Sequence, residues 1–165
     1  MPEVGMINIK WEDLVPGKEI ASQTYLMTID DIREEAEAYE DYNPLYSDTE
    51  FAQKTDIGYV VAPFYITLGE FLPPLMKVGL KMGVNTIYSK SVIESFKPIF
   101  VGDLITKKMI VEEKYEKRDK KFYTWRIEWV NQDGELVKRH LRTSYWVGTP
   151  QPLIKIDRSG REVTE

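Results

Sequence analysis

Four segments in the second half of the chain alternate apolar and polar residues with a period of two, and this pattern constrains the fold most strongly. The segments are residues 87–96, 104–117, 122–130 and 136–147. A period of two places successive side chains on opposite faces of a β-strand. The Asp133-Gly134 pair, between the last two segments, is typical of a tight hairpin turn. We therefore predict four consecutive antiparallel strands.

The same alternation predicts which face of the sheet is buried. In the last three strands, one set of alternate positions is largely apolar. The expected inward-facing residues are Ile105, Met109, Val111, Tyr115, Tyr123, Trp125, Ile127, Trp129, Val137, Leu141, Tyr145 and Val147. Aromatic residues make up 12% of the chain, which favours a strand-rich fold or a large apolar interface. We expect Trp125, Trp129 and Trp146 to lie in the core or at a subunit interface rather than to stack on a ligand.

The first half of the chain predicts one strand followed by short helices. Residues 18–28 alternate after a Pro-Gly turn signal, so they predict a strand. Thr28 and Asp31 form a capping-box-like pair at the start of a helix. That helix must end before Pro44, because the residue preceding a proline is biased away from helical dihedrals. A further short helix is predicted over residues 48–54.

An apolar helix is predicted to begin at Pro63, since proline suits the first turn of a helix. The residues that follow are apolar on most sides, which is typical of a buried helix. Pro73-Pro74 should break or kink it, with a second helical piece ending near Met82. An apolar helix laid across a curved antiparallel sheet is an α+β layer arrangement.

Length and composition limit the organisation and exclude several functions. A chain of 165 residues fits one domain, which we place at residues 1–148, with a tail at residues 149–165. The net charge of −5 argues against a nucleic-acid binder. With no cysteine and one histidine, His140, we expect no metal site, no thiolate nucleophile and no Ser–His–Asp triad. No segment resembles a signal peptide or a membrane span, so we expect a cytoplasmic protein that needs no cofactor.

Two acidic residues, Glu40 and Asp41, stand at the predicted C-terminal end of the first helix. Negative charge is disfavoured there by about 0.3–1 kcal/mol. A carboxylate that is also shielded from water would tend toward a raised pKa and would suit a general base. A solvated acid at a frayed helix end is the alternative. A calcium loop is excluded, because Leu45 and Tyr46 stand where an oxygen ligand and a glycine are needed.

Residues 40–48 read Glu-Asp-Tyr-Asn-Pro-Leu-Tyr-Ser-Asp, and this stretch resembles the D-x-N-P-x-H-x-D signature of the MaoC-like (R)-specific enoyl-CoA hydratases and hydroxyacyl-thioester dehydratases. Residues 11–17 and 96–103 agree with that family in order and spacing. Residues 62–63, Ala-Pro, look most like the corresponding segment of the N-terminal MaoC-like dehydratase subfamily. The resemblance spans about residues 11–147 and implies a hot-dog fold, in which an antiparallel sheet wraps a long central helix.

The resemblance also implies the roles of individual residues. In this family, the aspartate and histidine of the signature activate a water that adds to the 2,3-double bond of an acyl thioester. A backbone N–H in a His-Gly pair polarises the thioester carbonyl. The implied catalytic candidates are Asp41, Asn43 and Tyr46, and the implied substrate-binding candidates are Ala62, Pro63, Phe64, Tyr65 and Phe71.

The chain departs from the family pattern at two of these positions. Tyr46 replaces the histidine, and tyrosine has a reference pKa of about 10, which makes it a poor proton shuttle at neutral pH. Ala62-Pro63 replaces His-Gly, and proline has no N–H to donate to an oxyanion. Losing one such donor typically lowers the rate by about 10²–10³-fold.

The favoured hypothesis is therefore a substrate-holding hot-dog subunit that binds an acyl-CoA or acyl-carrier-protein thioester and pairs with a catalytic MaoC-like partner. A homodimeric hydratase with an altered Asp41 and Tyr46 site is the first alternative, in which the Phe64 amide could polarise the carbonyl. A non-enzymatic acyl-thioester binder and a hot-dog thioesterase are the others. Basic residues at 117–121, together with Lys138, Arg139 and Arg142, are interpreted as surface charges rather than phosphate ligands.

Overall fold

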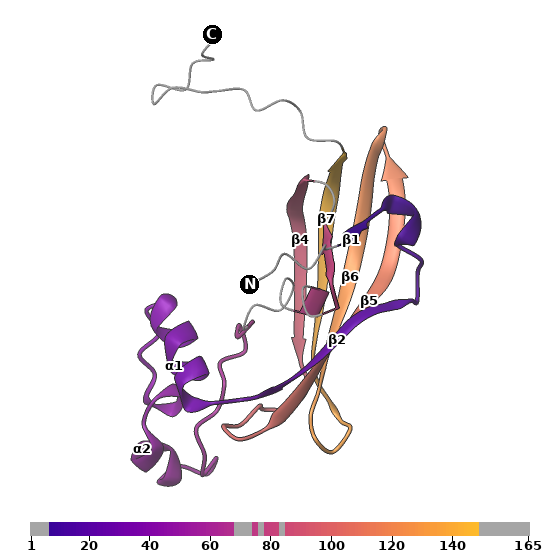
Figure 1. The fold of residues 1–165 in the computed structure, drawn as a ribbon. Coiled ribbons are helices and arrows are strands. Elements are labelled where there is room, and N and C mark those ends of the chain that lie inside the picture. Colours follow the sequence, from indigo (N-terminus) through magenta and orange to yellow (C-terminus); the bar gives the residue numbers. More distant parts are fainter. Residues whose placement is uncertain (1–6, 68–73, 76–77, 83–84, 149–165) are drawn as a thin grey trace, which may run out of the picture.

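The main element of the structure is a five-stranded antiparallel sheet with the strand order β2-β5-β6-β7-β4. The structure, a computed structural model, describes residues 7–67, 74–75, 78–82 and 85–148 (Figure 1). The sheet consists of β2 (Glu19–Leu26), β4 (Asn85–Ser95), β5 (Leu104–Lys117), β6 (Lys120–Val130) and β7 (Leu136–Gly148). The four strands predicted in the second half and the early strand are all confirmed.

Two tight turns set the register of the central strands. Arg118 and Asp119 connect β5 to β6 with φ values of 52° and 60°. Positive φ at both positions is the geometry of a type I′ turn, which matches the twist of the strands it joins. The predicted turn at Asp133-Gly134 is also present, and Gly134 has a φ of 78° there. These short connections make β5, β6 and β7 consecutive neighbours in the sheet.

The inner face of β5 and β6 forms the core largely as predicted. Tyr123, Trp125, Ile127 and Trp129 are each 0% exposed. Ile105, Met109 and Val111 on β5 are also 0% exposed. Tyr115 is 38% exposed, which contradicts its predicted burial. The register between β5 and β6 shifts between Val111 and Glu113, and this shift interrupts the alternation before it reaches Tyr115.

The predicted apolar face of β7 is wrong. Lys138 pairs opposite Trp129, and His140 pairs opposite Ile127. Residues directly opposite one another share a face of the sheet, so β7 directs a largely polar set toward the core. That set is Lys138, His140, Arg142, Ser144 and Trp146. Of the four β7 residues that were expected to face inward, Val137 alone is classed as buried.

The helices of the first half begin where the capping residues predict. The α1 helix (Ile29–Ala38) follows Thr28, whose side chain accepts a hydrogen bond from the Asp31 N–H at 3.1 Å. A 3-10 turn covers Pro44–Tyr46, and the short α2 helix (Thr49–Gln53) follows its cap, Asp48. Figure 1 shows α1 and α2 together beside one end of the sheet.

The predicted apolar helix does not begin at Pro63, and only a short helical piece of it lies within the described residues. Residues 63–67 form a turn and irregular backbone rather than the first helical turn. Residues 74–75 are helical, and residues 68–73 and 76–77 lie outside the described part of the chain. Near the expected helix end, the β3 strand (Leu80–Met82) pairs in parallel with β1 (Ile7–Ile9), which corrects that prediction. Gly79, with a φ of 73°, stands at the transition into β3.

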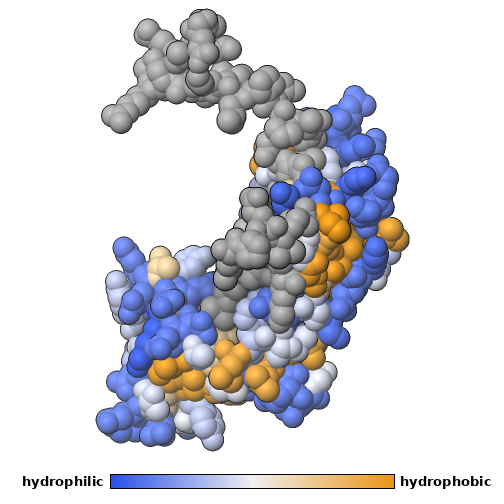
Figure 2. All heavy atoms as spheres, viewed as in Figure 1, coloured by the Kyte–Doolittle hydropathy of each residue, from blue (hydrophilic) through white to orange (hydrophobic). Residues whose placement is uncertain are grey.

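The predicted C-terminal tail, residues 149–165, lies outside the residues that the structure describes. Within the described ranges, none of the helices combines the length and apolarity needed to cross a membrane. On the face shown in Figure 2, hydrophilic residues cover much of the surface, and apolar residues gather near the lower end of the sheet and along its middle.

Candidate functional site

The backbone at the end of α1 fixes the position of Asp41. The Glu40 N–H donates to the Glu37 carbonyl at 2.9 Å, and the Asp41 N–H donates to the Ala36 carbonyl at 2.9 Å. This pair of bonds is a Schellman motif, which normally places glycine in the left-handed conformation. Here Glu40 occupies that position with a φ of 55°. Asp41 is therefore tied to the helix although it lies beyond its last turn.

The Asp41 carboxylate is half-buried and hydrogen-bonded on both oxygens. The Tyr65 hydroxyl donates to Oδ2 at 2.8 Å, and the Asn43 N–H donates to Oδ1 at 3.3 Å. The Tyr65 ring also packs on the Tyr39 ring with centroids 4.6 Å apart. Of the two interpretations of this acid, the structure contradicts a freely solvated residue at a frayed end. The role of Asp41 as a general base stays a prediction, to be tested by experiment.

Both tyrosines near this carboxylate are held in the protonated form. Burial, followed by the hydrogen bond to Asp41, raises the pKa of Tyr65. Burial, followed by the charge of Asp41, also raises the pKa of Tyr46, against a smaller opposing effect of Asn43. A phenol with a raised pKa donates hydrogen bonds but does not accept a proton at neutral pH. Tyr46 therefore does not reproduce the chemistry of an imidazole.

Asn43 shapes the loop between Asp41 and Tyr46. Its Oδ1 accepts a hydrogen bond from the Leu45 N–H at 3.1 Å and caps the 3-10 turn. The Leu45 carbonyl in turn accepts from the Val61 N–H at 3.2 Å, which brings the Asn-Pro-Leu-Tyr stretch beside residues 61–65. The described contacts of Asn43 are thus those of a residue that positions the loop.

The backbone at Ala62-Pro63 has no N–H to offer a ligand. The Ala62 N–H donates to the Ile99 carbonyl at 2.8 Å, and Pro63 has none. Among the described residues, the next N–H groups, those of Phe64 and Tyr65, make no backbone hydrogen bond. These are the nearest groups along the chain that could polarise a carbonyl.

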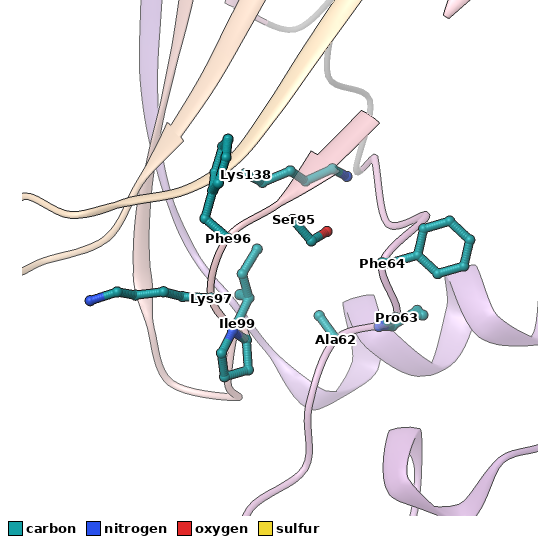
Figure 3. Close-up of a pocket in the computed structure, with 9 residues that line it drawn as sticks. Ala62, Pro63, Phe64, Ser95, Phe96, Lys97, Ile99 and Lys138 are labelled. Carbon is teal, nitrogen blue, oxygen red and sulfur yellow. The ribbon is translucent and has the colours of Figure 1, made fainter. Parts of the chain in front are cut away.

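A pocket of about 330 Å³ lies between this segment and the end of β4 (Figure 3). It is lined by Ala62, Pro63, Phe64, Ser95, Phe96, Lys97, Pro98, Ile99 and Lys138. Figure 3 shows Ser95 and the end of Lys138 on the side that faces residues 62–64, whereas Lys97 points away. Phe64 is 67% exposed and Lys138 is 1% exposed, so the pocket has an open aromatic rim and a buried cation.

The structure brings the predicted residues together in two groups. Asp41, Asn43, Tyr46 and Tyr65 cluster beyond α1, and none of them lines the pocket. Ala62, Pro63 and Phe64 line the pocket itself. Phe71 lies outside the described residues. Tyr65, predicted to bind substrate, donates a hydrogen bond to Asp41, the proposed base, and its role in substrate binding stays a prediction.

Two buried lysines hold the segment that joins these groups. The interpretation of Lys138 as a surface charge is wrong, because its side chain is 1% exposed, and Lys107 is 0% exposed. Lys107 Nζ donates to the Thr67 carbonyl at 2.9 Å, and Lys138 Nζ donates to the Ile66 carbonyl. Each ammonium lies over the Trp129 ring, 4.1 Å and 4.4 Å from its centroid. Such cation–π contacts help to compensate for the burial of charge.

A signal for Lys107, though not for Lys138, was present in the sequence. Lys107 lies at an inward-facing position between Ile105 and Met109, where the alternation predicts an apolar residue. A lysine at an inward position must find hydrogen-bond acceptors or stay in water.

Glu35 on α1 also holds the segment of residues 66–67, because its Oε1 accepts hydrogen bonds from the Thr67 N–H at 2.6 Å and from the Thr67 hydroxyl at 2.8 Å.

His140 is buried on β7, where its Nε2 lies 2.8 Å from the Ser91 hydroxyl and 3.1 Å from the Tyr88 hydroxyl. Both partners belong to β4, the neighbouring strand. These described contacts place His140 where β4 and β7 pair.

A family model supports the resemblance found in the sequence. The model for the FAS1-like dehydratase domain region matches residues 15–140. No curated protein matches the chain in sequence.

Solved structures with similar folds extend over most of the chain. The monoamine oxidase regulatory protein of Archaeoglobus fulgidus is 28% identical, with a TM-score of 0.72, and the match covers 87% of this chain and 97% of that one. The MaoC-like dehydratase of Rhodospirillum rubrum is 22% identical, with a TM-score of 0.70 and coverage of 88% and 100%.

A chain of the C-terminally truncated HadBC (3R-hydroxyacyl-ACP dehydratase) complex of Mycobacterium tuberculosis is 20% identical, with a TM-score of 0.68 and coverage of 79% and 96%. With these likenesses, the predicted α+β hot-dog fold is confirmed.

Proposed function

Since the chain belongs to the MaoC-like dehydratases, as a member with a FAS1-like dehydratase domain region, we propose that it is the substrate-holding subunit of an acyl-thioester hydratase or dehydratase. Its ligand is an acyl-CoA or acyl-carrier-protein thioester. A second hot-dog subunit that carries the intact histidine and glycine supplies the reactive groups.

The observation that carries this proposal is the altered donor site at Ala62-Pro63. A thioester carbonyl that becomes an enolate needs a hydrogen-bond donor where the negative charge develops. Here the Ala62 N–H is already bonded to the Ile99 carbonyl, and proline has none. Tyr46 compounds the defect: tyrosine is protonated at neutral pH, and burial raises the pKa of Tyr46 further, so its phenol cannot accept a proton from water. The chain thus retains a pocket but lacks both the backbone N–H donor of the His-Gly pair and the histidine of the signature.

The pocket supports a holding role. Its lining is mainly apolar, with Pro63, Phe96 and Ile99 among its residues, and its volume is about 330 Å³. Ligand sites are typically concave and mostly apolar, with a few polar groups that orient the ligand. The polar residues of this lining are Ser95, Lys97 and Lys138, of which Lys97 points away from residues 62–64 in Figure 3.

The exposed edge strand β4 supports the proposal that a partner subunit binds this chain. It pairs with β7 on one side and is the last strand in the sheet order. Ile87, Tyr88 and Val92 on β4 are 57%, 48% and 38% exposed. An exposed apolar edge strand is a surface that pairs readily with another chain. A chain with a similar fold occurs in the HadBC (3R-hydroxyacyl-ACP dehydratase) complex of Mycobacterium tuberculosis.

A homodimeric hydratase with altered chemistry is the second candidate. It is favoured by one observation, the N–H groups of Phe64 and Tyr65, which make no backbone hydrogen bond among the described residues. Asp41, already bonded to the Tyr65 hydroxyl, would then act as the base.

Hydration of crotonyl-CoA separates these candidates. The assay compares the purified chain with the chain co-expressed with a MaoC-like subunit that has the intact histidine. We expect no activity alone and activity in the pair, retained when Asp41 is replaced by Asn. Activity of the chain alone that Asp41→Asn abolishes, and that the neighbouring control Glu40→Gln leaves intact, would establish the homodimeric enzyme instead.

A further inference from the structure

Apolar residues of β7 that do not enter the core lie on the outer face of the sheet. Tyr145 pairs opposite Phe122, which alternates with the buried Tyr123 and therefore points away from the core. Leu141 and Val147 stand at alternate positions on the same strand as Tyr145, so they share this outer face. A contiguous apolar set on an outer face is typical of an interaction surface.

Four side chains form a continuous row across β5, β6, β7 and β4, which lie side by side in the sheet (Figure 1). The rings of Tyr115 and Phe122 stack with centroids 5.3 Å apart, and those of Phe122 and Tyr145 are 5.5 Å apart. Ile87 pairs opposite Tyr145 and completes the row on β4. We call these four residues the outer row. Tyr115 is 38% and Ile87 is 57% exposed, so both ends of the row are accessible.

A groove of about 260 Å³ lies beside the outer row. It is lined by Lys90, Val92, Glu112, Glu113, Thr124, Leu141 and Thr143. Thr124 and Thr143 follow Phe122 and precede Tyr145 by two residues, so they lie next to the row on the same face. Small residues beside large rings leave space into which the side chains of another segment can pack. This groove is separate from the pocket at Ala62-Pro63, with which it shares no lining residue.

The chain contains a suitable segment directly after β7. The strand ends at Gly148, three residues beyond Tyr145. Residues 149–165 contain four aliphatic side chains, and three of them gather at Leu153, Ile154 and Ile156. Such a group is unusual in a polar tail that has nothing to pack against. The family model ends at residue 140, so this segment is not part of the family match.

The length of the segment fits the outer row. Tyr145 lies about 10 Å along the strand from Gly148. Residues 149–152 can bridge up to about 13 Å, and their two prolines, which cannot donate to a sheet ladder, favour departure from β7. The row crosses three strand spacings, about 14 Å, and residues 152–156 extend over about 16 Å. The segment can therefore turn back and span the row.

The charges at the β5–β6 turn also match the segment. Lys117 pairs directly opposite Lys120, and like charges at such positions are unfavourable. Lys120 Nζ lies 5.5 Å from the centre of the Tyr145 ring, which places this charge beside the outer row. Asp157 directly follows the three aliphatic residues of the segment. A carboxylate near the two lysines would offset their repulsion.

We propose that residues 152–156 dock in an extended conformation on the outer row of the same chain. Ile154 and Ile156 alternate with Lys155, so an extended segment directs both isoleucines toward the row and the lysine toward solvent. The docked segment covers the outer face as far as Ile87 on the edge strand. This inference goes beyond the proposed function and does not depend on it, because the segment leaves the pocket uncovered.

Paramagnetic relaxation enhancement in the full chain tests the proposal. The protein has no cysteine, so Ser159→Cys provides a single attachment point for a nitroxide beyond the docking segment. We expect the amide signals of Phe122 and Tyr145 to lose intensity. Those of Glu128 and Arg139, about 20 Å away along the same strands, should keep it.

Matched variants identify the contacts that hold the segment. Ile154→Ser combined with Ile156→Ser should restore the lost intensities and lower the melting temperature by about 2–4 °C, as for the loss of a modest apolar contact. Val163→Ser removes the remaining aliphatic residue of the tail and should change neither quantity. From the other side of the contact, Tyr115→Ser at the exposed end of the row should also restore intensity.

Several results would overturn the proposal. One is an equal intensity at both ends of β6 and β7 in the labelled chain. Another is a loss of intensity that survives the two isoleucine replacements or Tyr115→Ser, because the segment would then lie elsewhere. A mixed sample, in which the isotope and the nitroxide are on different molecules, detects docking on a second copy. A loss in that sample as large as in the singly labelled chain would refute docking within one chain.

Discussion

Replacement of Glu40 by glycine should stabilise the protein, because Glu40 holds the left-handed position of the Schellman motif at the end of α1. Its φ is 55°. A side chain with a Cβ pays about 1–2 kcal/mol for this conformation, whereas glycine adopts it freely. Glycine also gains more freedom in the unfolded chain, which offsets about 0.4–1 kcal/mol. These backbone terms alone leave a net gain of about 0.5–1 kcal/mol.

The charge of Glu40 has to be separated from its backbone effect. An acid near a helix C-terminus is itself unfavourable by about 0.3–1 kcal/mol, so Glu40→Gly changes two terms together. Glu40→Ala removes the charge and keeps the Cβ. The backbone term is therefore the difference between the glycine and alanine variants, and we expect glycine to be the more stable of the two by about 0.5–1 kcal/mol.

Urea unfolding followed by tryptophan fluorescence measures this difference. Trp125 and Trp129 are both 0% exposed, so unfolding changes their surroundings completely. For a chain of this size, about 1 kcal/mol corresponds to a shift in melting temperature of about 2–4 °C. A glycine variant that is no more stable than the alanine variant would refute the assignment of strain to Glu40, and with it the account of how Asp41 is positioned.

Three further changes have expected outcomes. Thr28→Ala removes the cap of α1 and should lower the free energy of unfolding by about 1 kcal/mol, with circular dichroism showing earlier loss of helix; an unchanged melt would contradict the capping role. Gly134→Ala forces a Cβ into a φ of 78° and should cost about 1–2 kcal/mol in urea unfolding, so a neutral result would contradict the turn geometry. Because the pKa of Tyr65 is raised in the folded state, the stability it contributes is complete below its unfolded pKa of about 10 and is lost as the pH rises further. Tyr65→Phe should therefore reduce the decline in stability above pH 10, and an identical decline in both proteins would show that Tyr65 does not carry it.

The sequence predicted the strands well because their signals are local. The turn at Asp133-Gly134 and the alternation in residues 122–130 depend on neighbours in the chain, and the structure contains both. The caps of α1 and α2, Thr28 and Asp48, are equally local, and both side chains accept the expected backbone hydrogen bonds.

The face of β7 was mispredicted because it depends on pairing rather than on composition. Apolar residues on β7 alternate with Lys138, His140 and Arg142, and hydropathy alone places the basic set in solvent. The register with β6 reverses this, since it aligns Lys138 with Trp129. A single strand contains no information about its partner, so the sequence could not reveal the buried lysine.

The sequence predicted which residues belong to the candidate site but not which of them lie close together. Asp41 and Tyr65 are 24 residues apart, and the hydrogen bond between them could not be inferred from either segment alone. The separation of Asp41 from the pocket at Ala62-Pro63 depends in the same way on how residues 61–67 cross the end of the sheet. Similarly, β3 replaced the expected end of a helix because residues 80–82 pair with a strand from the start of the chain.

The pairing of β1 with β3 joins residues 7–9 to residues 80–82, which are more than 70 positions away in the sequence. Ile7 stands opposite Leu80, and Ile9, the last residue of β1, is 3% exposed. During synthesis β1 cannot pair with β3 until residues 80–82 have left the ribosome. Loss of β1 would remove the only strand neighbour that the described residues give β3 and would take Ile9 out of the hydrophobic core, so this short strand contributes to the interior of the fold.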